Sequence, residues 1–297
     1  IGGIIGDLKW FGLSFDTMKD ITLAYPNTLA FAIFQMMFAV ITPALITGAI
    51  AERMKFSSLV IFATIWSVIV YYPLAHMVWG GGLLFKMGAI DFAGGNVVHI
   101  SSGVSALVLA VLLGKRKHIE KATYHPHNVP FVVLGASLLW FGWFGFNAGS
   151  ALSANELAIH AFMTTNTSAA AAMLSWLLIE KVKNGKPTLV GASTGLVIGL
   201  VAITPGAGFV PVWAALIIGA MVSPICYFFI SVVKPKFGYD DALDVFGCHG
   251  VGGIWGGIAT GLFAKSSINS AAAWDGLVFG DVTLFLRQLA AIGISLG

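Results

Sequence analysis

Charged side chains are scarce in this sequence. Asp, Glu, Lys and Arg together make up 10% of its 297 residues, and hydrophobic residues make up 58%. A water-soluble domain usually has about 25% charged residues, so water is not the main solvent of this chain. The formal net charge of +3 gives no reason to expect a nucleic-acid partner.

The sequence also lacks the marks of an enzyme. It contains no nucleophile motif and no His-Glu-x-x-His signature, which argues against an intramembrane hydrolase. His125-Pro-His127 supplies two ligands without a partner cluster, a weak case for a metal site. Cys226 and Cys248 lie in apolar stretches, where cysteine usually serves as a small packing side chain. We therefore expect no enzymatic activity, no metal and no cofactor.

Long apolar stretches are what the sequence has instead. Each can cross a hydrocarbon core of about 30 Å, which needs roughly 20 helical residues. The stretch from 187 to 233 is too long for one crossing, and Thr204-Pro-Gly-Ala-Gly208 breaks it into two expected helices. The stretches cover residues 28 to 50, 58 to 85, 92 to 114, 128 to 155, 157 to 179, 187 to 233, 245 to 264 and 282 to 297.

This pattern predicts an all-α fold, a polytopic membrane helix bundle with eight full spans and a ninth cut short. We treat residues 1 to 297 as a single membrane domain, truncated at both ends, because Ile1 is not an initiator Met and the last stretch is too short to finish a crossing.

Basic residues concentrate in every second loop between the stretches. By the positive-inside rule these loops are cytoplasmic, which places residues 1 to 26 outside in a multi-pass protein of the plasma membrane. The residues concerned are Arg53, Lys55, Lys115, Arg116, Lys117, Lys121, Lys181, Lys183, Lys186, Lys234 and Lys236.

Glycine spacing and an internal echo indicate how the helices associate. Gly253, Gly257 and Gly261 recur every four residues, and small residues so placed let helix backbones approach closely in lipid. Asp91 precedes His99 in a Gly-rich segment, and Asp244 precedes His249 in another. The echo suggests an inverted internal repeat, as transporters often have.

Histidines within the apolar stretches are candidate functional residues, because burying an ionisable group is costly. His76, His99, His160 and His249 lie within or at the ends of the stretches. For any one of them, a satisfied structural group and a pore group are both open readings. The echoing positions of His99 and His249 favour a pore.

Aromatic residues form two stripes at helical spacing. Phe34, Phe38 and Leu45 share one helix face, and Trp143, Phe146 and Ser150 share another. Packing alone would explain either stripe. Together with Trp79 they suggest a small vestibule for a hydrogen-bonding cation, which an aromatic face attracts by about 0.5–2 kcal/mol once it is desolvated.

These features together carry a family resemblance. The chain resembles the ammonium transporter family, which includes the Rhesus proteins, from the third family helix to the start of the eleventh. The resemblance implies the ammonium-transporter fold of eleven helices, an outside amino terminus and a homotrimer with one pore per subunit. It rests on Phe34-Gln-Met-Met-Phe38, Gly48-Ala-Ile-Ala-Glu-Arg53, Ala75-His-Met-Val-Trp-Gly80, Asp91-Phe-Ala-Gly-Gly95 followed by His99, Trp143-Phe-Gly-Phe-Asn-Ala-Gly-Ser150 and Asp244-Val-Phe-Gly-Cys-His249.

The resemblance also assigns roles to individual residues. It implies an external ammonium-recruitment site, a stacked phenylalanine pair that closes the entrance, twin pore histidines joined by a hydrogen bond, and two aspartates with structural or electrostatic roles. Trp79 and Ser150 favour the microbial or plant branch over the Rhesus branch. The recruitment site is Phe34, Phe38, Trp79 and Ser150; the gate is Phe38 and Phe146; the pore has His99, His249, Leu45 and Trp143; the aspartates are Asp91 and Asp244.

The expected function is ammonium transport for nitrogen uptake. A full charge faces a large desolvation cost in a narrow apolar pore, whereas neutral ammonia faces little. We expect the vestibule to select the cation, the proton to leave near Phe38 and Phe146, and ammonia to pass His99 and His249, with or without a separate proton relay. An ammonium sensor with little flux and a channel for another small neutral solute remain alternatives. PII signalling proteins cap some relatives from inside and are possible partners.

Overall fold

The computed structural model describes residues 2–8, 10–13, 28–117, 119 and 126–297. Within these ranges every regular element is a helix, which confirms the predicted all-α class. The predictions for residues 14–26, for Lys121 and for His125 lie outside the described residues. The α-helices are α2 (Thr28–Ile50), α3 (Phe56–Trp66), α4 (Tyr72–Trp79), α5 (Leu83–Lys86), α6 (Ser101–Leu113), α7 (Val129–Ala148), α8 (Glu156–Asn184), α9 (Leu189–Ile203), α10 (Val212–Phe228), α11 (Lys234–Phe237), α12 (Val251–Phe263) and α13 (Val282–Leu296).

Short segments of tighter or wider helix join these α-helices. Four of them are π-helical, in which the backbone bonds close over five residues and not four. They are η2 (Ser67–Tyr71), η3 (Gly95–Ile100), η5 (Phe229–Val233) and η6 (Phe246–Gly250). The 3-10 turns are η1 (Phe11–Leu13), η4 (Gly149–Ala151) and η7 (Leu277–Phe279).

Among the described residues, six continuous helical stretches are long and apolar enough to cross a membrane. Large apolar side chains such as Ile61, Val68, Phe141 and Val182 are exposed on the outside of the bundle, as expected of helices whose solvent is lipid. The number of complete crossings, eight with part of a ninth, stays a prediction. The six stretches are Leu29–Ile50, Phe56–Lys86, Gly95–Leu113, Val129–Ala151, Glu156–Asn184 and Val212–Phe237.

The expected break in the long apolar stretch is present. Helix α9 ends at Ile203 and α10 begins at Val212, with Thr204 and Pro205 at the start of the connecting turn. Residues 204–210 of this turn are buried. The turn is therefore packed inside the bundle and not laid over its surface.

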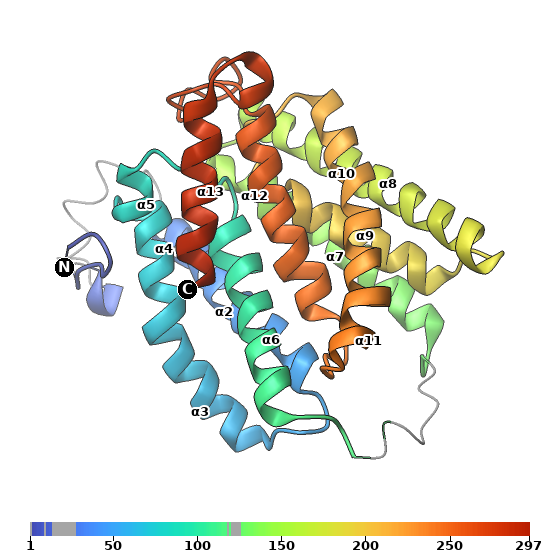
Figure 1. Ribbon diagram of the computed structural model, residues 1–297. Helices are drawn as coiled ribbons and strands as arrows, with labels where there is room; N and C mark the ends of the chain where they lie inside the picture. The colour runs from blue at the N-terminus through green and yellow to red at the C-terminus, as the bar shows by residue number, and fades with distance from the viewer. Residues whose placement is uncertain (1, 9, 14–27, 118, 120–125) are drawn as a thin grey trace.

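The bundle has two main apolar cores. One forms among α2, α3, α4 and α6, and the other among α8, α9, α10 and α12. Figure 1 shows α3 to α5 on one side of the molecule and α8 to α10 on the other, with α12 and α13 between them. Segments η3 and η6, which directly precede α6 and α12, contact each other. Val97 of η3 belongs to the first core and Cys248 of η6 to the second.

Glycine brings these two helix starts together. A Cβ atom on Gly103 of α6 would lie 2.2 Å from the backbone nitrogen of Gly250 in η6, so no other residue fits at this crossing. The predicted glycine seam is buried as expected. Gly253 faces His99 and Ile100, Gly257 faces Ile292, and Gly261 faces Gln288.

Candidate functional site

A cavity of about 440 Å³ lies where α2, α4 and η4 approach one another. All four residues predicted to recruit the substrate line it: Phe34, Phe38, Trp79 and Ser150. Its size is in the usual range for small-molecule sites, and its lining is mostly apolar. The structure therefore brings together side chains from distant parts of the sequence into one vestibule.

The indole N–H of Trp79 and the hydroxyl hydrogen of Ser150 both form hydrogen bonds to backbone carbonyls. The indole Nε1–H of Trp79 donates to the carbonyl oxygen of Asp91 at 2.8 Å, and the Ser150 hydroxyl donates to the carbonyl of Phe146 at 2.8 Å. What they offer to the vestibule is thus an aromatic ring and a hydroxyl oxygen with free lone pairs. Both groups suit a cation that donates hydrogen bonds.

The predicted gate residues are in ring contact at the inner end of the vestibule. The centroids of Phe38 and Phe146 are 4.6 Å apart with the ring planes at 45°. The rings are thus tilted, whereas the resemblance implied a stacked pair. Phe38 also contacts Trp79, with centroids 5.5 Å apart, and Phe146 contacts His99, with centroids 6.1 Å apart.

Beyond the gate residues lie the two histidines. Nδ1 of His99 and Nδ1 of His249 are 3.2 Å apart, a hydrogen bond in which one ring donates and the other accepts. His99 is 1% and His249 is 9% exposed. The imidazole hydrogen bond that the resemblance implied is therefore present, inside the bundle.

Trp143 and Thr204 complete the surroundings of His99. The Trp143 ring stacks on the His99 ring with centroids 5.6 Å apart, and its Nε1–H donates to the Thr204 hydroxyl at 3.0 Å. His99 Nε2 lies 3.3 Å from the same hydroxyl. The sequence predicts Thr204 only as part of a helix-breaking turn and does not predict this contact, because nothing local signals that the turn folds inward.

Both histidines are carried on π-helical turns. His99 lies in η3 and His249 lies in η6, and such turns often occur at functional sites because they displace a side chain from the regular helical position. The carboxylate of Asp91 caps η3. Its oxygens accept hydrogen bonds from the backbone N–H groups of Gly94, Gly95, Asn96 and Val97 at 2.7–3.4 Å.

Asp241 caps η6 in the same manner and was missed by sequence analysis. Its Oδ2 accepts the backbone N–H of Phe246 at 2.8 Å, and its side chain is buried. The signal was available: Asp241 precedes His249 by eight positions, as Asp91 precedes His99. The repeat predicted from the sequence instead pairs Asp244 with His249.

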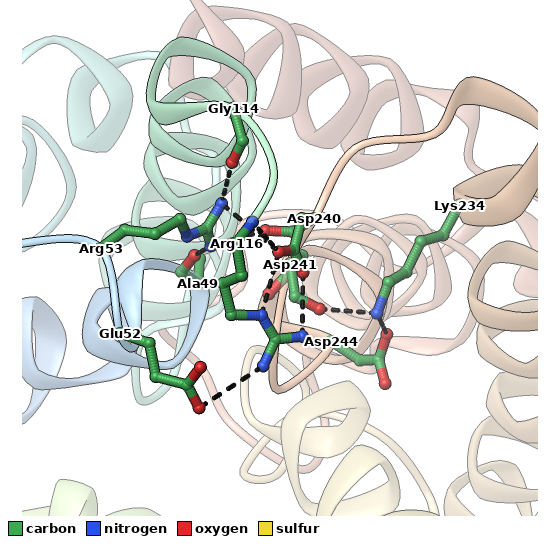
Figure 2. A network of polar contacts seen from close by, with 9 residues as sticks. All are labelled: Ala49, Glu52, Arg53, Gly114, Arg116, Lys234, Asp240, Asp241 and Asp244. Atoms are coloured by element: carbon green, nitrogen blue, oxygen red, sulfur yellow. Dashed lines mark hydrogen bonds and ion pairs between the residues drawn. The ribbon is translucent and has the colours of Figure 1, made fainter. Parts of the chain in front are cut away.

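Asp244 belongs to a polar network at the opposite end of the bundle from the vestibule. It has a left-handed backbone, with φ of 55°, and its Oδ1 pairs with Lys234 Nζ at 2.6 Å. Figure 2 shows how Arg53 and Arg116 converge on Asp240 beside it. Helix α2 leads from Phe34 in the vestibule to Arg53, just after its last turn.

Asp240 is the centre of this network. Its carboxylate accepts hydrogen bonds from Arg116 Nε at 2.9 Å and from the Arg116 backbone N–H at 2.8 Å, and Arg53 lies 4.0 Å away. Burial by itself would raise the pKa of Asp240, but the hydrogen bonds and charges of the two arginines outweigh it and hold that pKa below its ordinary value.

The remaining predicted residues have packing or backbone partners. Leu45 is half-buried and packs in the same apolar cluster as Phe38. His160 Nε2 bonds the Val210 carbonyl at 2.8 Å, which supports a structural role, and His76 lines a separate cavity beside Lys86. Within the described residues, no group of three or more His, Cys, Asp or Glu side chains could hold a metal ion.

Several known proteins are similar to this chain in sequence and in fold. Residues 1–297 match the model of the Ammonium Transporter Family. The chain is 54% identical to an ammonium transporter of Bacillus subtilis, over 97% of this chain and 71% of that protein. It is 47% identical to ammonium transporter Amt1 of Archaeoglobus fulgidus, over 98% of this chain and 71% of that protein. The chain belongs to the ammonium transporter family.

Solved structures of the family agree. Saccharomyces cerevisiae Mep2 has a TM-score of 0.84 and 41% identity, over 90% of this chain and 63% of that one. The chain thus spans slightly less than two thirds of Mep2. A protein described as Sensor Amt Protein has a TM-score of 0.83 and 29% identity, over 99% of this chain and 75% of that one.

Family membership bears on several sequence predictions. The protein is a multi-pass protein of the plasma membrane. Bacterial and archaeal relatives and the yeast Mep2 structure confirm the expected microbial or plant branch over the Rhesus branch. These relatives are named as transporters, which agrees with the expectation that the chain is not an enzyme.

Proposed function

We propose that this protein transports ammonium, with a cation entering the vestibule and neutral ammonia passing the histidines. The observation that supports it is a continuous series of ring contacts from the vestibule to the interior. Trp79 contacts Phe38, Phe38 contacts Phe146, Phe146 contacts His99, and His99 contacts His249. Trp79 and Phe38 line the cavity, whereas Phe146, His99 and His249 are not among its lining residues.

Desolvation explains why the substrate changes its charge along this series. Ammonium in the vestibule gains the Trp79 face and the Ser150 oxygen in place of part of its water. Past Phe38 and Phe146 the rings of His99 and His249 are buried, and at such depth an unpaired charge is very costly and a neutral molecule is not. The cation therefore loses its proton near these two rings, either to water on the vestibule side or to the histidine pair, and neutral ammonia continues.

The hydrogen-bond network supports one arrangement of protons on the histidines. Trp143 can only donate to the Thr204 hydroxyl, and that hydroxyl donates to the Leu200 carbonyl at 2.8 Å. His99 Nε2 must then be the protonated nitrogen that donates to Thr204, which leaves His99 Nδ1 as an acceptor for His249 Nδ1–H. Neutral rings linked in this way can pass a proton by exchanging donor and acceptor roles.

The membrane orientation and assembly follow the same proposal. The basic network around Arg53 and Arg116 lies at the end opposite the vestibule, so the positive-inside rule places the vestibule outside. We propose a homotrimer, each subunit with its own pore, and a cytoplasmic PII protein as a regulatory partner at the basic end.

One alternative has a specific observation in its favour. The similarity to the protein described as Sensor Amt Protein raises the possibility that this chain senses ammonium with little flux. A channel for another small neutral solute is the other alternative, but it has no need of Trp79 and Ser150 beside an open vestibule.

Transport is tested by reconstituting the full-length protein in liposomes. Ammonium uptake and ammonium-driven current are measured together, with protein-free liposomes and Trp79→Leu as comparisons. Uptake well above the protein-free rate, with reduced apparent affinity in Trp79→Leu, is the expected result. Ammonium binding without uptake would support the sensor, and equal permeation of a neutral solute would support the general channel.

A further inference from the structure

Gln288 is a fully buried polar residue in the middle of α13, with 0% of its surface exposed. Its amide binds one backbone position twice. Oε1 accepts the Ile90 N–H at 2.9 Å, and Nε2 donates to the Ile90 carbonyl at 2.8 Å. An amide side chain has a donor and an acceptor side by side and therefore matches the N–H and carbonyl of one residue.

Ile90, the residue that Gln288 binds, lies at the wall of the vestibule. Ile90 and Asp91 both line the cavity. The Asp91 carbonyl accepts the Trp79 indole N–H, and this N–H is the only hydrogen-bonding group of the Trp79 side chain. The Trp79 indole is thus linked to α13 in two steps: it donates to the Ile90–Asp91 backbone segment, and this segment is bound by the Gln288 side chain.

A glycine on the neighbouring helix α12 leaves space for the Gln288 side chain. Gly261 of α12 faces the Gln288 side chain, and a Cβ atom there would lie 3.2 Å from Gln288 Cβ and Cγ. Ile90 also packs in an apolar cluster with Leu284, which lies on α13 like Gln288. Helix α13 therefore supports the vestibule from behind, although none of its residues lines the cavity.

We propose that Gln288 is a positioning residue for ammonium recruitment: its amide fixes the Ile90–Asp91 backbone and thereby sets the place of the Trp79 ring in the vestibule. This inference depends on the proposed function, because it assigns Gln288 to the recruitment step of that transport.

The other features of the site explain why recruitment is the step that depends on Gln288. His99 has supports that do not pass through Ile90 or Asp91: it contacts Gly253 and forms hydrogen bonds with Thr204 and His249. The Trp79 indole has no such second hydrogen bond. Loss of the amide should therefore displace Trp79 before it disturbs the histidines.

The test uses Gln288→Met, which keeps the length and apolar bulk of the side chain but leaves the Ile90 N–H and carbonyl unpaired. In liposomes of the full-length protein, the ammonium concentration for half-maximal uptake should rise on the order of three- to tenfold, as expected for a weakened cation–π contact. The maximal rate should stay within about twofold, since the histidines keep their other supports.

Two further variants separate positioning from general packing. Ile292→Ala, on the same helix and against Gly257, removes buried apolar volume away from Ile90 and should leave the half-maximal concentration unchanged. If Gln288→Met does not fold, Gln288→Asn, which withdraws a retained amide by one methylene, takes its place with the same expected direction.

A double variant decides whether Gln288 acts through Trp79. On a Trp79→Leu background, Gln288→Met should cause no further loss of apparent affinity, because the ring it positions is already absent. The proposal would be overturned if the losses of apparent affinity in the two single variants multiplied in the double variant. It would also be overturned if Gln288→Met and Ile292→Ala had the same half-maximal ammonium concentration. If Trp79→Leu alone leaves apparent affinity unchanged, the recruitment site itself is wrong, which is a separate outcome.

Discussion

Asp91 and Asp241 occupy equivalent places in the two halves of the molecule. Each carboxylate accepts the backbone N–H of the residue five positions further on, Asn96 at 2.7 Å and Phe246 at 2.8 Å. Each lies eight positions before a histidine of the buried pair. The caps differ in one respect: both oxygens of Asp91 are bonded, whereas Oδ1 of Asp241 is buried without a hydrogen-bond partner among the described residues.

This difference predicts unequal effects of removing the two charges. Asp91→Asn turns an acceptor oxygen into an NH₂ group that faces backbone N–H groups, which should lower stability by about 1–3 kcal/mol. Asp241→Asn can keep its one oxygen toward Phe246 and should cost less than about 1 kcal/mol. Thermal unfolding of the purified proteins in detergent measures both. Equal losses would show that the two caps are not distinguished by their bonding.

The contact between His99 and His249 predicts that neither ring can be replaced without loss of selectivity. If the pair passes a proton, His99→Ala and His249→Ala should each abolish ammonium-driven current or admit potassium, because alanine can neither donate nor accept. Ammonium and potassium currents are compared in liposomes of both variants and the parent.

The competing explanation is that the histidines only fill the core. Each variant should then lose roughly 1–3 kcal/mol of stability, while the surviving protein keeps its selectivity. Unchanged ammonium selectivity in both variants would therefore eliminate the relay.

The bond from Trp143 to Thr204 predicts that the hydroxyl at position 204 is required. Thr204→Val has the same shape but leaves the Trp143 N–H and His99 Nε2 without their partner, so both stability and ammonium-driven current should fall. Thr204→Ser retains the hydroxyl and serves as the matched control, with current close to the parent. A Thr204→Val protein with normal current would mean that the hydroxyl does not orient His99.

The lowered pKa of Asp240 predicts a pH window for stability. A carboxyl whose pKa is lower in the folded than in the unfolded protein adds stability above its unfolded pKa, about 3.9, and this stability is lost as the pH falls through the lower folded pKa. The parent should therefore exceed Asp240→Asn in thermal stability by a constant margin from pH 7 to about 4. The margin should shrink at lower pH.

Glu52 provides the control for this prediction. Its side chain is 61% exposed and lies 3.9 Å from Arg116, whereas that of Asp240 is 2% exposed. Glu52→Gln should therefore change stability by no more than about 1 kcal/mol at any pH tested. A margin for Asp240→Asn that stays constant down to pH 3 would show that its charge does not stabilise the fold.

Local sequence was enough to predict the helices and to select residues that the structure brings to one cavity and one series of ring contacts. Apolar length predicted the membrane helices, and the Thr204-Pro-Gly-Ala-Gly208 segment predicted the break before α10, because proline and glycine interrupt a helix wherever it lies. Motifs that resemble the ammonium transporter family pointed to Phe38, Trp79, Ser150 and the two histidines. Such properties depend on residues close together in the chain.

Only the tertiary structure decided how those residues are supported. Asp241 and not Asp244 is the counterpart of Asp91, which became clear from the cap it forms on η6. Thr204 reaches His99 because its turn folds into the core, and Gln288 reaches Ile90 across 198 positions of sequence. A hydrogen bond between distant segments depends on how helices cross, and that geometry follows from close backbone contacts such as Gly103 against Gly250, which no local pattern specifies.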